Sequence, residues 1–215
     1  LDLGRQFEPR PVDPGTDRTI PRGKQYWQAK SESIFYTRTT GLWQPVWMEA
    51  AGATRVARLR ITPDVDGARV TVAADLEQAA RPTAPATPVT LRVTARLDDV
   101  VQASAEVATT GTTGTTTLSL PSQRLWSPDR PTLYDVTVEV IANNRPIDRV
   151  DSYFGQRKIG FRDGRMYLNN APYFLRMVLD QGYWPESILT PPSEEAIQYD
   201  IRMTKAFGFN GVRKH

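Results

Sequence analysis

The sequence predicts a mainly β protein, with one β-sandwich in the middle of the chain and an α/β segment after it. Short runs of alternating apolar and polar residues fill the middle, and after Gly160 they give way to longer apolar runs around one helix. The chain has 215 residues, of which 40% are hydrophobic and 24% charged. That length suits one large domain or two smaller ones, and the composition is that of an ordinary globular protein.

The predicted sandwich extends from Ala53 to about Ile159. Seven stretches in this region alternate with the period of two that a half-buried strand requires: 55–61, 68–76, 89–97, 103–108, 115–120, 133–142 and 149–159. Turn-forming Gly, Pro, Asn and Asp residues separate them, a pattern typical of an immunoglobulin-like sandwich, here without a disulfide. The alternation predicts that six side chains point into the core: Val72, Leu91, Val93, Leu118, Val136 and Val138.

The segment before the sandwich has a different character. Residues 1–24 are rich in Pro and Gly and indicate a loop, whereas 26–27, 33–38 and 43–49 are short aromatic and β-branched runs. These runs predict the closing strands of a preceding β-domain. We therefore expect three regions, 1–51, 52–160 and 161–215.

The third region predicts a βαβ unit. Residues 173–179 form an almost continuous apolar run, as in a strand of a buried parallel sheet. Ser193 is a helix N-cap followed by two carboxylates in the first turn, and Gly208 suits the position after the helix. Residues 209–213 then predict a second strand. Such a unit needs further parallel strands beside it.

Composition excludes several classes of function. The chain has no Cys, and its one His is His215, so we expect no metal, no cofactor and no histidine-based catalytic triad. The net charge of +3 is diffuse, which argues against nucleic acid as a partner. No run approaches the roughly 18 apolar residues of a membrane helix, and the first residues given do not form the basic and then apolar pattern of a signal peptide. The compartment stays open between bacterial cytoplasmic and secreted.

Five strings, in this order along the chain, resemble glycoside hydrolase family 2, the family of β-galactosidases, β-glucuronidases and β-mannosidases. The resemblance implies the tail of a jelly-roll sugar-binding domain, an immunoglobulin-like domain and the start of a catalytic TIM barrel. The strings lie at residues 36–49, at Trp126-Ser127-Pro128 with 131–134, at 154–159, at 168–176 and at 208–213.

The resemblance also implies the chemistry of the parent enzyme. Retaining glycosidases use two carboxylic acids about 5–5.5 Å apart. In the family both lie on later barrel strands, and the acid/base follows an Asn. This sequence has no Asn-Glu pair, so we expect no catalytic residue and no activity in this chain. Glu194 and Glu195 are explained by their place at the helix start.

Four residues near the ends of the two predicted strands are candidates for contacting sugar in the parent: Asp180, Trp184, Arg213 and His215. Arg213 matches an arginine of the family, and an ion pair inside the barrel would explain it equally well. Packing would explain Trp184, and Trp43 and Trp47 fit a β-core better than a sugar platform. Asp180 stands where galactosidases usually carry Asn and His, which suggests either another substrate preference or a divergent branch of the family.

An alternative class is a stand-alone immunoglobulin-like carbohydrate-binding or adhesion module. It explains the sandwich but leaves the apolar βαβ segment without a role. The chain does not begin with Met and stops after an apolar run, so we expect an internal fragment whose uncovered strands could pair in a dimer. The reading frame beyond His215 would distinguish the two classes.

Overall fold

The computed structural model describes residues 30, 32–33, 42, 45–78, 88–109 and 111–215. They fall into two compact units: Met48–Leu175, and Arg176–His215 together with the residues that precede Met48. The predicted runs at 26–27 and 34–38, and Trp43, lie outside the described residues.

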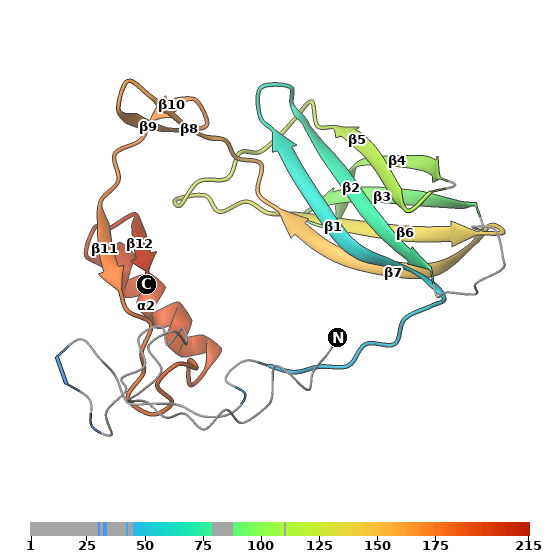
Figure 1. The fold of residues 1–215 in the computed structure, drawn as a ribbon. Helices are drawn as coiled ribbons and strands as arrows, with labels where there is room; N and C mark the ends of the chain where they lie inside the picture. The colour runs from blue at the N-terminus through green and yellow to red at the C-terminus, as the bar shows by residue number, and fades with distance from the viewer. Residues whose placement is uncertain (1–29, 31, 34–41, 43–44, 79–87, 110) are drawn as a thin grey trace. The chain divides into compact units, whose positions relative to one another are not determined.

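Seven strands of the first unit form two antiparallel sheets (Figure 1). One sheet has the order β1 (Thr54–Asp64), β2 (Arg69–Gln78) and β5 (Thr113–Ser119). The other has the order β4 (Val100–Thr109), β3 (Val89–Leu97), β6 (Tyr134–Ala142) and β7 (Arg145–Phe154). All seven predicted strands are present. The ends of the first six lie within a few residues of the prediction, and the seventh begins and ends several residues earlier than predicted.

One apolar core lies between the two sheets. The core residues come mainly from β2, β3, β5, β6 and β7. Within a strand, alternate residues face the other sheet, so about every second residue contributes to the core. The six residues predicted to point inward are at most 2% exposed, which confirms that prediction. Each fully buried Val or Leu contributes about 1.5–3 kcal/mol to folding.

Tight turns set the register of the second sheet. Asn143 and Asn144 connect β6 to β7, and Asp98 and Asp99 connect β3 to β4; all four have positive φ. Two-residue loops with positive φ at both positions match the twist of the strands they join, and Asn and Asp tolerate that backbone better than most residues do. The turn predicted at 143–146 is thus confirmed at its first two residues.

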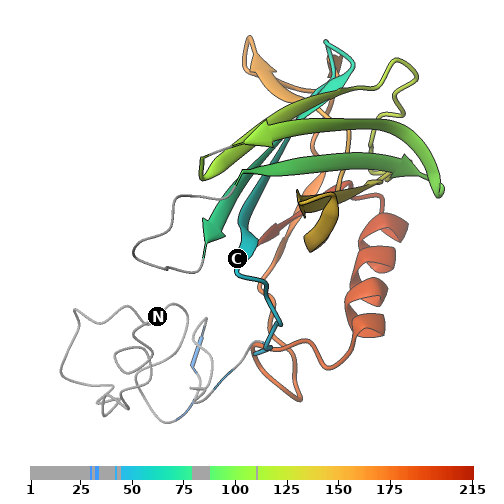
Figure 2. The same ribbon diagram turned by 90° about the vertical axis from the view of Figure 1, so that its right-hand side faces the viewer.

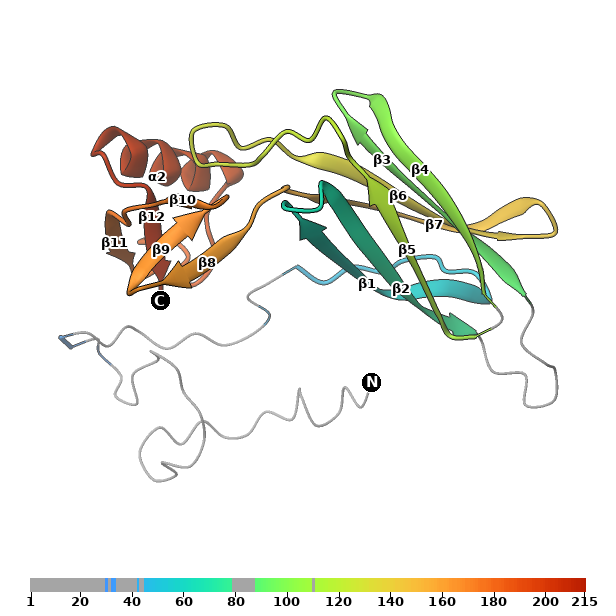
Figure 3. The same ribbon diagram turned by 90° about the horizontal axis from the view of Figure 1, so that it is seen from above.

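A small three-stranded sheet follows the sandwich within the same compact unit. It contains β8 (Ile159–Arg162), β9 (Arg165–Leu168) and β10 (Ala171–Pro172), and β8 and β9 lie side by side in Figure 3. The single strand predicted over 149–159 is therefore wrong in its second half. The chain leaves β7 at Phe154, because Gly155 and Gln156 turn inward against other residues.

The second unit contains the predicted βαβ unit. Strand β11 (Met177–Asp180), helix α2 (Glu194–Ala206) and strand β12 (Gly211–Lys214) follow one another, and the two strands pair in parallel. Figure 2 shows α2 in red. The Ser193 side chain accepts a hydrogen bond from the Ala196 N–H at 3.2 Å, and Gly208 follows the helix with a φ of 83°. Both end signals are confirmed.

Two sequence predictions differ from the structure. Residues 173–176 of the predicted first strand form no strand, because only four residues of β11 find a partner in β12. Residues 45–49 form no strand either, although 43–49 was predicted as one. A strand needs a partner strand for its backbone groups, and none of the strand pairs in the described part of the chain includes this segment.

Candidate functional site

The carboxyl ends of β11 and β12 bring charged side chains together. Asp180 ends β11 and Lys214 ends β12, and the parallel register places these two residues opposite each other. Lys214 Nζ lies 2.6 Å from Asp180 Oδ2, and the Gly182 N–H donates to Asp180 Oδ1 at 2.8 Å. Both carboxylate oxygens are therefore held by groups from two separate segments.

Asp180 is ionised at neutral pH. Its partial burial acts to raise the pKa, but the hydrogen bonds from Lys214 and from the Gly182 N–H outweigh burial and hold the pKa below the usual value. A carboxylate in this state accepts hydrogen bonds and has no proton to give. Asp180 can thus orient a hydroxyl group but cannot serve as a general acid.

The structure brings only some of the predicted site residues together. The His215 N–H donates to the Asp180 carbonyl at 2.9 Å, so these two residues are neighbours. Arg213 pairs with Leu179, and successive residues of a strand face opposite sides, so Arg213 lies on the other face of the strand pair from Asp180. Trp184 is half-buried and forms a tight turn with Ile188, with reciprocal backbone hydrogen bonds of 2.9 Å.

Sequence reasoning missed Lys214 and Gly182. The signal for Lys214 was its place directly after the apolar run of the second strand, level with the aspartate that follows the first. The signal for Gly182 is visible only in three dimensions: a Cβ at this position would lie 3.0 Å from Lys214 Cε. The glycine leaves room for the lysine side chain.

The acidic residues of α2 have structural roles. Glu195 accepts hydrogen bonds from its own backbone N–H and from Ser193, and these lower the pKa of its carboxyl group. Glu194 Oε1 accepts from Gln198 Nε2 at 3.1 Å. Among the described residues, no group of three or more His, Asp or Glu residues is arranged to hold a metal ion. In the same part of the chain, no helix is long and apolar enough to cross a membrane.

Residues of two of the five family-like strings, Trp126 and 155–157, pack together in a junction at one end of the sandwich. The Trp126 ring lies beneath the Arg157 guanidinium, 4.6 Å from ring centroid to Cζ, and a Cβ on Gly155 would lie 3.1 Å from the Trp126 side chain. Trp126 N–H donates to the Gln156 carbonyl at 2.9 Å. The strings around Trp126 and Phe154 are thus two halves of one packed structure.

Asn169 connects this junction to the small sheet. Its Nδ2 donates to the Trp126 carbonyl at 3.0 Å, and its Oδ1 accepts from the Lys158 N–H at 3.0 Å. The Asp66 carboxylate, in the turn between β1 and β2, accepts from Lys158 Nζ and from Asn170 Nδ2. The small sheet is therefore fixed to the sandwich by an ion pair and by amide hydrogen bonds.

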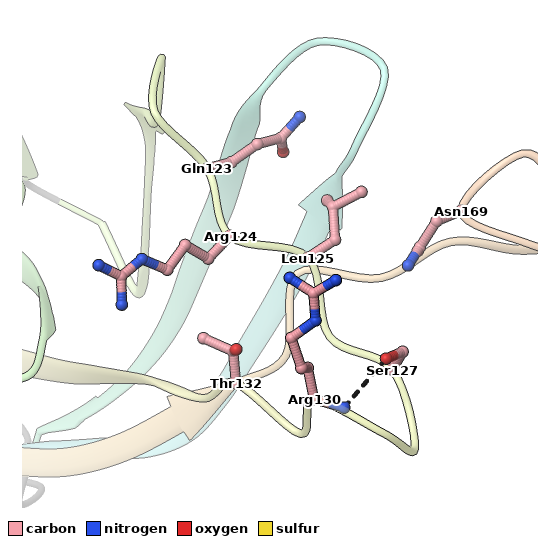
Figure 4. A pocket seen from close by; sticks show the side chains of 7 residues that line it. All are labelled: Gln123, Arg124, Leu125, Ser127, Arg130, Thr132 and Asn169. Carbon is pink, nitrogen blue, oxygen red and sulfur yellow. Dashed lines mark hydrogen bonds between the residues drawn. The ribbon is translucent and has the colours of Figure 1, made fainter.

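A groove of about 670 Å³ lies beside the junction (Figure 4). It is lined by Gln123, Arg124, Leu125, Ser127, Arg130, Thr132 and Asn169. The Gln123 amide is engaged with Val65 and Gln156, the Asn169 amide as described above, and Arg124 pairs with Asp98 at 3.0 Å. Because most of its polar groups already serve the fold, the groove is the outer surface of the junction rather than a built binding site.

The observed features define a class of protein: a β-sandwich region followed by an α/β segment, with a polar cluster at the ends of its two parallel strands. The sequence model of the glycosyl hydrolases family 2 matches residues 54–162, half of the chain. The chain belongs to this family. The match covers all seven sandwich strands and the strand β8, so the resemblance seen in the motifs is confirmed.

Individual relatives agree. The chain is similar to a β-galactosidase of Leuconostoc mesenteroides subsp. mesenteroides, with 32% identity over 108 residues, which cover 46% of this chain and 10% of that protein. Its fold is similar to a glycosyl hydrolase family 2 member from Bacteroides cellulosilyticus, with a TM-score of 0.68 and 20% identity over 76% of this chain and 22% of that one.

A β-glycosidase from Bacteroides vulgatus has a TM-score of 0.67 and 18% identity, over 84% of this chain and 23% of that one. The chain thus spans about a tenth of the curated relative and less than a quarter of either solved structure.

Proposed function

We propose that this chain is part of a retaining glycoside hydrolase that cleaves β-glycosidic bonds. The observation that carries the proposal is the family match over 54–162, followed directly by a parallel βαβ unit. Carbohydrate is then the substrate of the complete protein. The chemistry requires an acid/base and a nucleophile, and both would come from residues beyond this chain.

In this proposal the sandwich is the immunoglobulin-like domain of the enzyme, over residues 52–160, and its work is geometric. The order of strands in its two sheets supports this assignment. The sandwich would connect the tail of a jelly-roll domain, in 1–51, to the start of a TIM barrel, in 161–215. The junction around Trp126 and Asn169 gives this connection a rigid end.

The β11–α2–β12 unit would be the first βαβ unit of the barrel. Its two strands are parallel, and a parallel pair of four-residue strands does not persist without neighbours. In a barrel the carboxyl ends of the strands form the active-site face, which is where Asp180, Lys214 and His215 lie. Trp184 and Arg213 stay candidates for substrate contact in the complete enzyme.

The alternative, a stand-alone carbohydrate-binding or adhesion module, explains less. A stand-alone sandwich module does not account for a helix between two parallel strands. Ser193 caps α2 and Gly208 follows it with a positive φ, so the sequence encodes both ends of this helix.

The test compares this chain with the product of its complete reading frame. The complete protein should hydrolyse an aryl β-glycoside, and replacing the Glu of its Asn-Glu pair with Gln should abolish turnover. The 215-residue chain alone should show no turnover above buffer. A reading frame that closes near His215, or a complete protein that is inactive on every aryl β-glycoside, would refute the proposal.

A further inference from the structure

Lys214 and Asp180 form an ion pair whose geometry is fixed from both sides. The parallel register aligns their backbones, and the Nζ to Oδ2 distance is 2.6 Å. The Lys214 side chain is 60% exposed and that of Asp180 is 29% exposed. An exposed ion pair adds little to stability, so a contribution to stability does not account for this pair.

The backbone beside the pair is shaped to hold it. Gly182 adopts a φ of 73°, a conformation that side chains other than Asn and Asp rarely adopt, and directs its N–H to Asp180 Oδ1. Because a Cβ at position 182 would crowd Lys214, the same glycine also clears the path of the lysine side chain. The same backbone position thus holds the carboxylate of Asp180 and leaves space for the Lys214 side chain.

The chemistry of the pair suits a hydroxyl group. A hydroxyl both donates and accepts, and it meets here a carboxylate that accepts and an ammonium that donates, side by side. The ammonium has three N–H donors, of which Asp180 takes one in the described part of the chain. The pair as a whole is neutral, so it offers no excess positive charge to the carboxylate of a uronic acid.

We infer that Asp180 and Lys214 act as one neutral donor–acceptor pair that binds hydroxyl groups of a neutral sugar and selects against a uronic acid. This inference rests on the proposed function, because it places the pair in the substrate site of a glycoside hydrolase. It adds Lys214 to the site and states the class of sugar.

The test uses the complete protein and two matched substrates, an aryl β-glycoside of a neutral hexose and the corresponding aryl β-uronide. The wild type should favour the neutral substrate in kcat/KM. Asp180→Asn leaves the Lys214 charge unpaired and should move the neutral-to-uronide ratio by roughly tenfold toward the uronide. Lys214→Met leaves the carboxylate unpaired and should move the ratio in the opposite direction.

Opposite shifts in the two variants distinguish substrate recognition from a structural role. If the pair were only structural, each variant would lower kcat/KM for the neutral substrate and for the uronide by the same factor. Glu77→Gln, which breaks an exposed pair with Arg55 on the sandwich, is the matched control and should leave the ratio unchanged. If Asp180→Asn and Lys214→Met still cleave the substrates and the neutral-to-uronide ratio of kcat/KM is unchanged in both, the inference is wrong while the proposed function stands.

Equilibrium binding gives a readout that does not need turnover. The free hexose and the free uronic acid are titrated into the complete protein and its two variants. Relative to the wild type, Asp180→Asn should shift the preference in Kd toward the uronic acid, and Lys214→Met should shift it toward the hexose. A protein that cleaves neither substrate refutes the proposed function, and unchanged Kd ratios then refute the inference as well.

Discussion

Gly114 packs directly against the opposite sheet. It lies buried in β5, and a Cβ there would lie 2.3 Å from Cδ1 of Leu91, which is 1% exposed in β3. Since Leu91 is enclosed by core residues, Gly114→Ala should destabilise the chain by about 1–3 kcal/mol, as measured by denaturant unfolding. Gly111→Ala is the control, because a Cβ at that position would meet only the Thr109 hydroxyl oxygen, at 4.0 Å. Equal stability of both variants would contradict the packing described here.

The Tyr134 hydroxyl serves the loop that carries Trp126. The ring is 1% exposed and stacked on Phe154, with 5.0 Å between centroids, and its oxygen accepts the Arg124 N–H at 2.6 Å. Tyr134→Phe keeps the packing but removes this acceptor, so the free energy of unfolding should fall by about 1–2 kcal/mol. Tyr153→Phe, at a ring that is 65% exposed, should change it by less than about 0.5 kcal/mol. An equal loss in both variants would argue against the hydrogen bond.

At the scale of single residues, the sequence predicted the core but not the contacts between distant segments. Val136 and Val138 could be assigned inward because strand alternation is a local property. The tight fit at Gly114 depends on the distance between two sheets, and the place of Lys214 depends on the register of two strands that are 34 residues apart. Neither quantity is present in the local pattern.

Asp66 makes the attachment of the small sheet sensitive to acid. Hydrogen bonds from Lys158 and Asn170 lower the pKa of the Asp66 carboxyl below its ordinary value of 3.8. The unfolded chain therefore binds a proton more readily than the folded one does, so this contribution to stability is present above that value and is lost as the pH falls below it. Amide hydrogen exchange in β8–β10 should accelerate in this range, relative to β6. Asp66→Asn should weaken the attachment at neutral pH and remove the added effect of acid; an unchanged acid response would show that another group is responsible.

At the scale of elements, sequence patterns located strands and the helix better than they located breaks. The strand predicted over 149–159 missed the end of β7, because the break arises where Gly155 packs on Trp126 and Gln156 turns into the interior. The small sheet was missed because its strands have at most four residues, too few for a period to be visible. The helix was found because its capping signals are local.

At the scale of the whole molecule, the two units differ in how much apolar surface they bury. The sandwich encloses a continuous core, whereas α2 has no buried residue, and Tyr199, Ile201 and Phe207 are each more than half exposed. In β11 and β12, Met177, Leu179 and Val212 are also exposed. Apolar surface of this extent on one short segment favours a covering partner, which in the proposed enzyme is the rest of the barrel.

The isolated chain should therefore behave as a stable sandwich with a weakly protected second unit. Amides of β2, β3 and β6 should exchange on the order of 100-fold more slowly than those of β11 and β12, since local opening of a segment with few buried contacts costs little free energy. In the complete protein, protection of β11 and β12 should rise to the level of the sandwich strands. Equal protection of both units in the isolated chain would show that the βαβ unit needs no covering.

Self-association is the remaining route by which the isolated chain could cover this surface. Light scattering should show a dimer that forms with rising concentration, and Ile201→Glu should weaken it by introducing a charge into the exposed apolar stripe of α2. Ala206→Glu, which adds the same charge on the opposite side of the helix, is the control and should leave the dimer intact. A chain that stays monomeric at every concentration would rule out pairing through these strands and this helix, while the difference in amide protection between the two units would stand as a separate measurement.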